Sequence, residues 1–203
     1  MKRVTLFAVL LLIITISTYA QNIQFTPIAG YTFADKFNFD RGKAKIGDGF
    51  TYGGILSYVI NDKMAIDISY SREDCDVFAY SDYYDIDIKG QISANYIFLG
   101  LEKLMPLNEN AFLFTGTNLG VGIYSGKNSD LKSTTKFAVG INGGLKYFFS
   151  DRLGFRAQAN LNFPITDVGA GLWWGGGGPS VGLTSRIPFL QFGFSGGLIF
   201  NLN

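Results

Sequence analysis

Apolar residues alternate with glycine or polar residues along most of the chain, and this alternation limits most strongly what the chain can fold into. The clearest stretch is Leu153–Phe163, LGFRAQANLNF, in which every odd position is apolar and every even position is glycine or polar. Successive side chains of a β-strand point to opposite faces of a sheet, so the pattern predicts a strand with one apolar and one polar face. After Gln21, no stretch shows a sustained helical period. The predicted fold class is therefore all-β.

Eight segments of this kind follow one another. They cover Ile23–Phe33, Phe50–Ile60, Met64–Ser71, Ile92–Lys103, Ala111–Ser125, Lys136–Phe149, Leu153–Phe163 and Leu190–Asn201. The fourth segment changes phase near Ile97, which predicts a β-bulge. Short connections alternate with four long ones, which span residues 34–49, 72–90, 126–135 and 164–189. We therefore expect an antiparallel up-and-down sheet of eight strands, with the short turns and both chain ends at one end.

The first twenty residues have the layout of an export signal. Lys2 and Arg3 precede an apolar run from Val4 to Ile16, and Ala20 supplies a small residue before Gln21. This three-part order is typical of a secretory signal peptide, and the apolar run is short for a membrane-spanning helix. We expect a cleaved signal peptide over residues 1–20 and a single β-domain over residues 21–203. An uncleaved anchor helix is the alternative.

Composition excludes several classes of function. Without Lys2 and Arg3, 15 of the 17 basic residues remain against 16 acidic ones, so no basic surface indicates a nucleic-acid partner. The sequence contains no histidine, which excludes catalysis or metal binding through an imidazole. Cys75 is the single cysteine, so no internal disulfide framework can form. No cofactor is implied.

The alternation alone does not say which face of the sheet points outward. A soluble ligand-binding barrel has its apolar face inside, whereas a membrane barrel has it outside. The polar face here consists mostly of small residues, which suits a narrow lumen, and strands of roughly 10 residues can cross a tilted bilayer path. Aromatic residues stand near the segment ends and suit two interfacial girdles: Tyr31, Phe33, Tyr58, Tyr70, Tyr147, Phe149, Phe163 and Phe200. The pattern favours a transmembrane β-barrel, with the soluble barrel as the alternative.

The whole segment order resembles the small outer-membrane β-barrels of the OmpA/OmpX type. The export signal, the eight segments, the alternation of long and short connections and the last strand ending GGLIFNLN carry this resemblance. It implies a monomeric barrel in the bacterial outer membrane, surrounded by lipid, with short turns facing the periplasm and long loops facing the exterior. Histidine-dependent outer-membrane enzymes are excluded, because this chain has no histidine.

Several charged residues of the polar face are expected to meet inside the barrel. Asp67, Lys146 and Arg156 each lie five residues from a short-turn residue, Asp62 or Asp151, so they share one depth. Gln158 lies one layer further up, and Glu102 joins them if its strand keeps phase. Buried charges need partners, so we expect an ion network that plugs the lumen, in which Asp67 pairs with Arg156 or Lys146. A selectivity ring in a gated conduit is the alternative.

The long loops hold the remaining candidate residues. Residues 72–90 contain six acidic residues, but their spacing does not match the EF-hand pattern, so no metal site is predicted. Tyr80, Tyr83 and Tyr84 of this loop are candidate contacts for a protein or a glycan, or they extend the hairpin beyond the membrane. Trp173 and Trp174 stand before four glycines in GLWWGGGGPSVG, which lacks the helix and the lysine of a nucleotide-binding loop. These tryptophans are candidates for interface anchoring or for an exposed contact surface.

Together these observations predict a non-enzymatic outer-membrane β-barrel with a plugged lumen. Its function would be envelope structure or surface interaction, such as adhesion or contact with a ligand or partner through the long loops. A narrow channel or transport protein is the first alternative, and a soluble secreted ligand-binding barrel is the second.

Overall fold

The computed structural model describes residues 23–39, 42–81, 86–126, 133–165, 167–175, 178–186 and 190–202. Within these ranges the chain forms eleven strands: β1 (Ile23–Thr32), β2 (Asp35–Phe39), β3 (Gly42–Asn61), β4 (Met64–Ser81), β5 (Ile86–Pro106), β6 (Ala111–Gly126), β7 (Thr134–Phe148), β8 (Leu153–Ile165), β9 (Asp167–Gly175), β10 (Gly178–Arg186) and β11 (Gln191–Asn201). In the same ranges, no helix has the length and hydropathy needed to cross a membrane.

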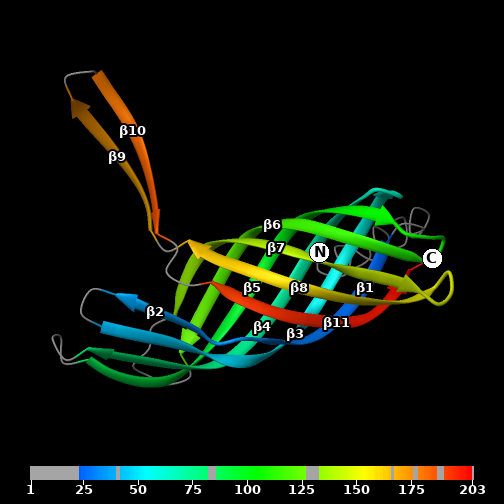
Figure 1. Ribbon diagram of the computed structural model, residues 1–203, viewed down its shortest axis with the longest axis horizontal. Coiled ribbons are helices and arrows are strands. Elements are labelled where there is room, and N and C mark those ends of the chain that lie inside the picture. Colours follow the sequence, from blue (N-terminus) through cyan, green and yellow to red (C-terminus); the bar gives the residue numbers. More distant parts are fainter. Residues whose placement is uncertain are drawn as a thin grey trace, which may run out of the picture.

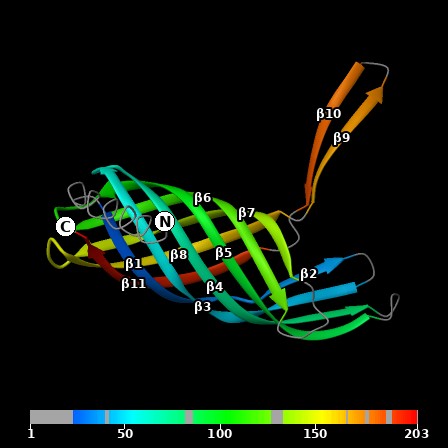
Figure 2. The same cartoon turned by 180° about the vertical axis from the view of Figure 1, so that it is seen from behind.

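Eight of these strands form a closed antiparallel barrel (Figures 1 and 2). Strands β3 to β8 pair in sequence order, β8 pairs with β11, and β1 closes the barrel by pairing with both β11 and β3. Closure gives every barrel strand a neighbour on each side within the barrel wall. Beyond the wall, β2 and the first residues of β5 pair on one side in the part of the chain that the structure describes. The predicted fold class, an all-β eight-stranded up-and-down barrel, is confirmed.

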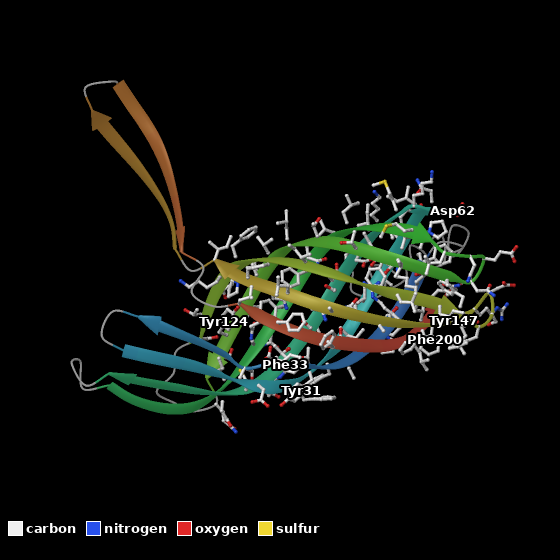
Figure 3. The ribbon with its side chains drawn as sticks, in the orientation of Figure 1. Tyr31, Phe33, Asp62, Tyr124, Tyr147 and Phe200 are labelled. Carbon is white, nitrogen blue, oxygen red and sulfur yellow. The ribbon has the colours of Figure 1, made fainter. Side chains whose placement is uncertain are left out.

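The short turns gather at one end of the barrel, as predicted. Gln24 near the start of β1 pairs with Asn201 near the end of β11, so these strand ends also lie there. Figure 3 shows Asp62, Tyr147 and Phe200 at this end, which we call the turn end, and Tyr124 toward the opposite end, which we call the hairpin end.

Much of the predicted long loops is in fact strand. Strand β4 continues to Ser81 and β5 starts at Ile86, so these two strands run as a paired hairpin far beyond residue 71. Strand β2 pairs with the first part of β3, and β9 pairs with β10 in a separate two-stranded sheet (Figure 1). The ladder continues because an extended strand leaves backbone donors and acceptors that its neighbour can satisfy.

The outer face of the barrel is apolar and the inner face is largely polar. Leu99 is 60% exposed on the outside, whereas Arg156 is fully buried inside. Of the eight aromatic residues predicted for the girdles, seven are exposed and Phe163 is half-buried. An apolar surface of this kind is stable against hydrocarbon rather than against water.

Strand β5 does not have the predicted bulge. It pairs in unbroken register with both β4 and β6, and its phase stays constant from Ala94 to Leu104. Tyr96 and Phe98 point inward and are buried, whereas Ile97 and Leu99 point outward and are exposed. The apparent change of phase arises because both faces of β5 carry large apolar residues here, so the polarity pattern no longer distinguishes inside from outside.

The adjacent glycines Gly143 and Gly144 allow a matched test of how closely β7 and β8 pack against each other. A Cβ atom added to Gly144 would collide with the backbone oxygen of Ala157, whereas a Cβ on Gly143 would make an ordinary contact at 3.4 Å with the oxygen of Phe114. We expect Gly144→Ala to lower the free energy of unfolding by about 1–3 kcal/mol, as overpacking does, because β7 and β8 would have to separate. Gly143→Ala should leave it nearly unchanged. Urea unfolding in detergent micelles measures both, and equal effects would contradict the close approach.

Candidate functional site

Four charged side chains from four strands meet inside the turn end of the barrel. We call this cluster, Asp67 of β4, Glu102 of β5, Lys146 of β7 and Arg156 of β8, the turn-end network. Arg156 Nη2 lies 2.8 Å from Glu102 Oε2 and 3.6 Å from Asp67 Oδ2, and Lys146 Nζ forms an ion pair with the same Glu102. All four side chains are at most 5% exposed. Glu102 therefore binds both cations, and Asp67 is the more weakly paired acid.

Neutral groups complete the environment of Arg156. Its Nε donates to Oε1 of Gln158 at 2.5 Å, and Gln158 Nε2 donates to Oδ1 of Asn160 at 2.7 Å. Asn160 in turn donates to the hydroxyl of Ser195 at 2.8 Å. The guanidinium carbon of Arg156 also lies 4.1 Å from the centre of the Phe114 ring, a cation–π contact. The guanidinium is thus held on several sides.

A small cavity with both polar and apolar side chains in its lining lies above the turn-end network. Its volume is about 50 Å³, and amide side chains line much of it: Asn118, Asn142, Gln158, Asn160 and Asn162. Glycines make room for these amides, because a Cβ on Gly100 would collide with Asn118, and a Cβ on Gly116 would collide with Asn142. Oδ1 of Asp67 and Oδ1 of Asn142 are buried without a hydrogen-bond partner in the protein. A cavity of this size with several polar groups in its lining can hold a few water molecules that donate to such oxygens.

A second group of side chains closes the lumen toward the hairpin end. We call this group, Glu73, Tyr96, Tyr124 and Gln191, the hairpin-end layer. The hydroxyls of Tyr96 and Tyr124 lie 2.7 Å apart, Tyr96 donates to Oε1 of Gln191, and Gln191 Nε2 donates to Oε2 of Glu73 at 3.1 Å. Tyr96 also stacks on Phe98, with ring centres 5.4 Å apart. These contacts join β4, β5, β6 and β11 across the lumen.

The hairpin-end layer and Phe114 are not among the residues predicted from the sequence. Glu73 falls in a segment predicted as a loop, and Tyr96 and Phe98 carry the apolar character expected of the lipid-facing side. The inward orientation of Tyr96 and Phe98 could have been found from the alternation of side chains along the strand. Counting by twos from Glu102 along β5 reaches Phe98 and Tyr96, so a constant phase would have placed both rings inside.

The structure does not describe the side chains of the tyrosines and tryptophans that the sequence suggested as loop contacts. Tyr83 and Tyr84 fall between β4 and β5, outside the described residues. The backbone of Tyr80 belongs to β4, and the backbones of Trp173 and Trp174 belong to β9. Cys75, predicted in a loop, stands on β4 and is buried. Among the described residues, no cluster of three acidic, cysteine or histidine side chains could hold a metal ion.

Known proteins of the same architecture match this chain. The sequence model of the family described as outer membrane protein beta-barrel domain matches residues 6–178. The structure is similar to that of Neisserial surface protein A, with a TM-score of 0.61, 15% identity and coverage of 88% of this chain and 96% of that one. It is similarly close to the outer membrane protein OprG from Pseudomonas aeruginosa, with a TM-score of 0.60, 13% identity and coverage of 88% and 96%. A search of curated proteins gives no match.

These findings agree with the apolar outer face and exclude the soluble secreted barrel. The family match covers most of the chain, and the two solved structures share its fold. The chain therefore belongs to the family of outer membrane β-barrel domain proteins and lies in the bacterial outer membrane.

Proposed function

We propose that this protein is a non-enzymatic outer-membrane barrel with a plugged lumen, acting in envelope structure or surface interaction through its long outer hairpins. The observation that carries the proposal is the double closure of the lumen. The turn-end network fills one end, the hairpin-end layer crosses the other, and the cavity between them measures about 50 Å³. An eight-stranded barrel has a lumen that side chains can fill.

The absence of catalytic activity is supported by the chemistry of the chain. The sequence has no histidine, and the turn-end carboxylates are engaged by Arg156 and Lys146 rather than held ready for proton transfer. A general acid or base needs a free path to a substrate, and the buried network offers none. The site residues Asp67, Glu102, Lys146, Arg156 and Gln158 are accordingly assigned a structural role.

Surface interaction is supported by the length of the hairpins at the hairpin end. Strands β3, β4 and β5 contain 20, 18 and 21 residues, roughly twice the length that a tilted bilayer crossing requires. By the orientation of the family, the excess length stands on the exterior side. A protein or glycan partner would meet this part, where Tyr80, Tyr83, Tyr84, Trp173 and Trp174 remain the candidate contacts. We expect the barrel to act as a monomer.

A narrow channel is the second candidate function. The cavity favours it, because amide side chains and unpartnered oxygens of Asp67 and Asn142 would line the middle of a hydrated path. The side-chain layers at both ends would then act as gates rather than as plugs.

Conductance in planar lipid bilayers separates the two functions. We expect the folded barrel to give no stepwise conductance, because both ends of the lumen are closed by contacts from at least three strands. Heat-modifiable migration on a detergent gel verifies that the inserted protein is folded. Regular conductance steps whose ion selectivity changes in Glu102→Gln would overturn the plug and establish the channel.

A further inference from the structure

A groove on the lipid-facing wall at the turn end is unexplained by either proposed function. It has a volume of about 470 Å³ and is mostly apolar. Its lining comes from β4, β5, β6 and the turn before β4: Lys63, Met64, Leu101, Glu102, Lys103, Thr115, Gly116 and Thr117.

The depth of the groove follows from the residues that point outward on β6. Thr115 and Thr117 stand between Leu113 and Leu119, which are 42% and 58% exposed. Short side chains between longer ones leave a hollow along the strand. The hydroxyl of Thr115 donates to the backbone oxygen of Asn142 at 3.4 Å, so the groove does not have to supply a partner for it. The hollow thus suits a hydrocarbon chain.

Two lysines stand at the turn-end rim of the groove. Lys103 is directly opposite Met64 in the ladder of β4 and β5, and the backbone oxygen of Lys63 accepts from the N–H of Leu104 at 2.7 Å. These contacts fix the two lysines on adjacent segments. Both are exposed, and within the described residues neither forms an ion pair. Two unpaired ammonium groups beside an apolar hollow are complementary to a lipid with an anionic headgroup.

Lys63 and Lys103 lie at the depth in the membrane where lipid headgroups are expected. Tyr58, Tyr147 and Phe200 form part of the exposed aromatic girdle at the turn end, where Figure 3 shows Tyr147 and Phe200. Aromatic girdles mark the boundary between hydrocarbon and headgroups, and lysine side chains extend along apolar surface to place their charge in the same layer. Lys63 and Lys103 therefore stand at the end of the barrel where its aromatic girdle marks the headgroup layer.

We propose that this groove, the Lys63–Lys103 groove, binds one anionic phospholipid. One acyl chain lies over Thr115 and Thr117 beside Leu101, and the phosphate is bound by Lys63 and Lys103. The site differs from general attraction of lysines to a membrane because it requires both the hollow and the charges.

Native mass spectrometry of barrels released from vesicles of phosphatidylglycerol and phosphatidylcholine tests the site. We expect the natural protein to retain one phosphatidylglycerol in preference to phosphatidylcholine. Each neutral variant, Lys63→Gln or Lys103→Gln, should lower this preference about 5-fold, and the double variant about 25-fold. Arg152→Gln is the matched control, because Arg152 is exposed in another turn at the same end and should leave the preference unchanged.

A second set of variants in the same mass-spectrometry experiment fills the apolar hollow of the groove. Thr115→Leu keeps both lysines and an apolar outer face, and it should reduce retention of both lipids. Ala159→Leu is its control, because Thr115 and Ala159 are both opposite Gly143 and so lie in one cross-strand row, two strands apart. The proposal is overturned if Arg152→Gln lowers the preference as much as the double lysine variant. It is equally overturned if Thr115→Leu and Ala159→Leu have the same effect.

Discussion

Replacing Arg156 with methionine is expected to lower the free energy of unfolding of the barrel by about 3–5 kcal/mol. Arg156 is fully buried and contacts both carboxylates of the turn-end network, at 2.8 Å from Glu102 and 3.6 Å from Asp67. Methionine fills a similar volume but leaves two buried acids with Lys146 as their single cation. Burying a charge without a partner is costly, because the low-dielectric interior does not replace the lost hydration.

Urea unfolding followed by circular dichroism in detergent micelles measures this loss. Arg152→Met is the control, since Arg152 is exposed in the turn before β8 and a surface change of this kind stays within about 0.5 kcal/mol. If Arg156→Met unfolded at the same urea concentration as Arg152→Met, the turn-end network would not stabilise the barrel.

Glu102→Gln is expected to have a comparable effect, about 3–5 kcal/mol, and a larger one than Asp67→Asn. Glu102 contacts Arg156 and Lys146, so the amide leaves these two buried cations, which are directly opposite each other on the paired strands β7 and β8, with Asp67 as the remaining acid of the network. Asp67 has a single ion pair, at 3.6 Å, and one of its oxygens has no partner in the protein. The same urea titration ranks the two variants, and an Asp67→Asn loss equal to that of Glu102→Gln would contradict the assignment of Glu102 as the shared partner.

The double variant Arg156→Met/Glu102→Gln distinguishes the loss of the ion pair between these residues from the loss of packing at each one. Glu102→Gln should cost much less in the Arg156→Met background, because the cation that it pairs with is already gone. Coupling between contacting residues typically amounts to about 0.5–3 kcal/mol. Strict additivity of the two losses would show that Glu102 and Arg156 stabilise the barrel independently.

Much of the barrel can be predicted from the sequence because the membrane imposes one rule on every strand. Most outward residues within the bilayer meet hydrocarbon, so the apolar half of the alternation is favoured there, as in Leu153–Phe163. Turn lengths then give the topology. Charged lumen positions can also be placed, because a strand advances by a fixed distance per residue, and counting from Asp62 and Asp151 brings Asp67, Lys146 and Arg156 to one depth.

The features that could not be predicted lie in the lumen and beyond the membrane, where the alternation of apolar and polar residues is not required. Inside the lumen an aromatic ring is tolerated as well as an amide, so Tyr96, Phe98 and Phe114 carry no polarity signal that marks them as internal. Beyond the membrane neither face must be apolar, so the continuation of β4 to Ser81 is invisible to a search for alternation. The hairpin-end layer combines both difficulties, since it joins Tyr96 of β5 to Glu73 just past the predicted end of β4.

The distribution of charge over the strands constrains how the barrel can enter the membrane. Asp67 and Glu102 stand on the paired strands β4 and β5, whereas Lys146 and Arg156 stand on the paired strands β7 and β8. Each hairpin alone would carry two like charges into hydrocarbon, at a cost that neither can offset by itself. In the closed barrel the acidic and the basic hairpin face each other and form the ion pairs of the turn-end network. We therefore expect closure of the barrel to favour insertion, because it brings the acidic and the basic hairpin into contact.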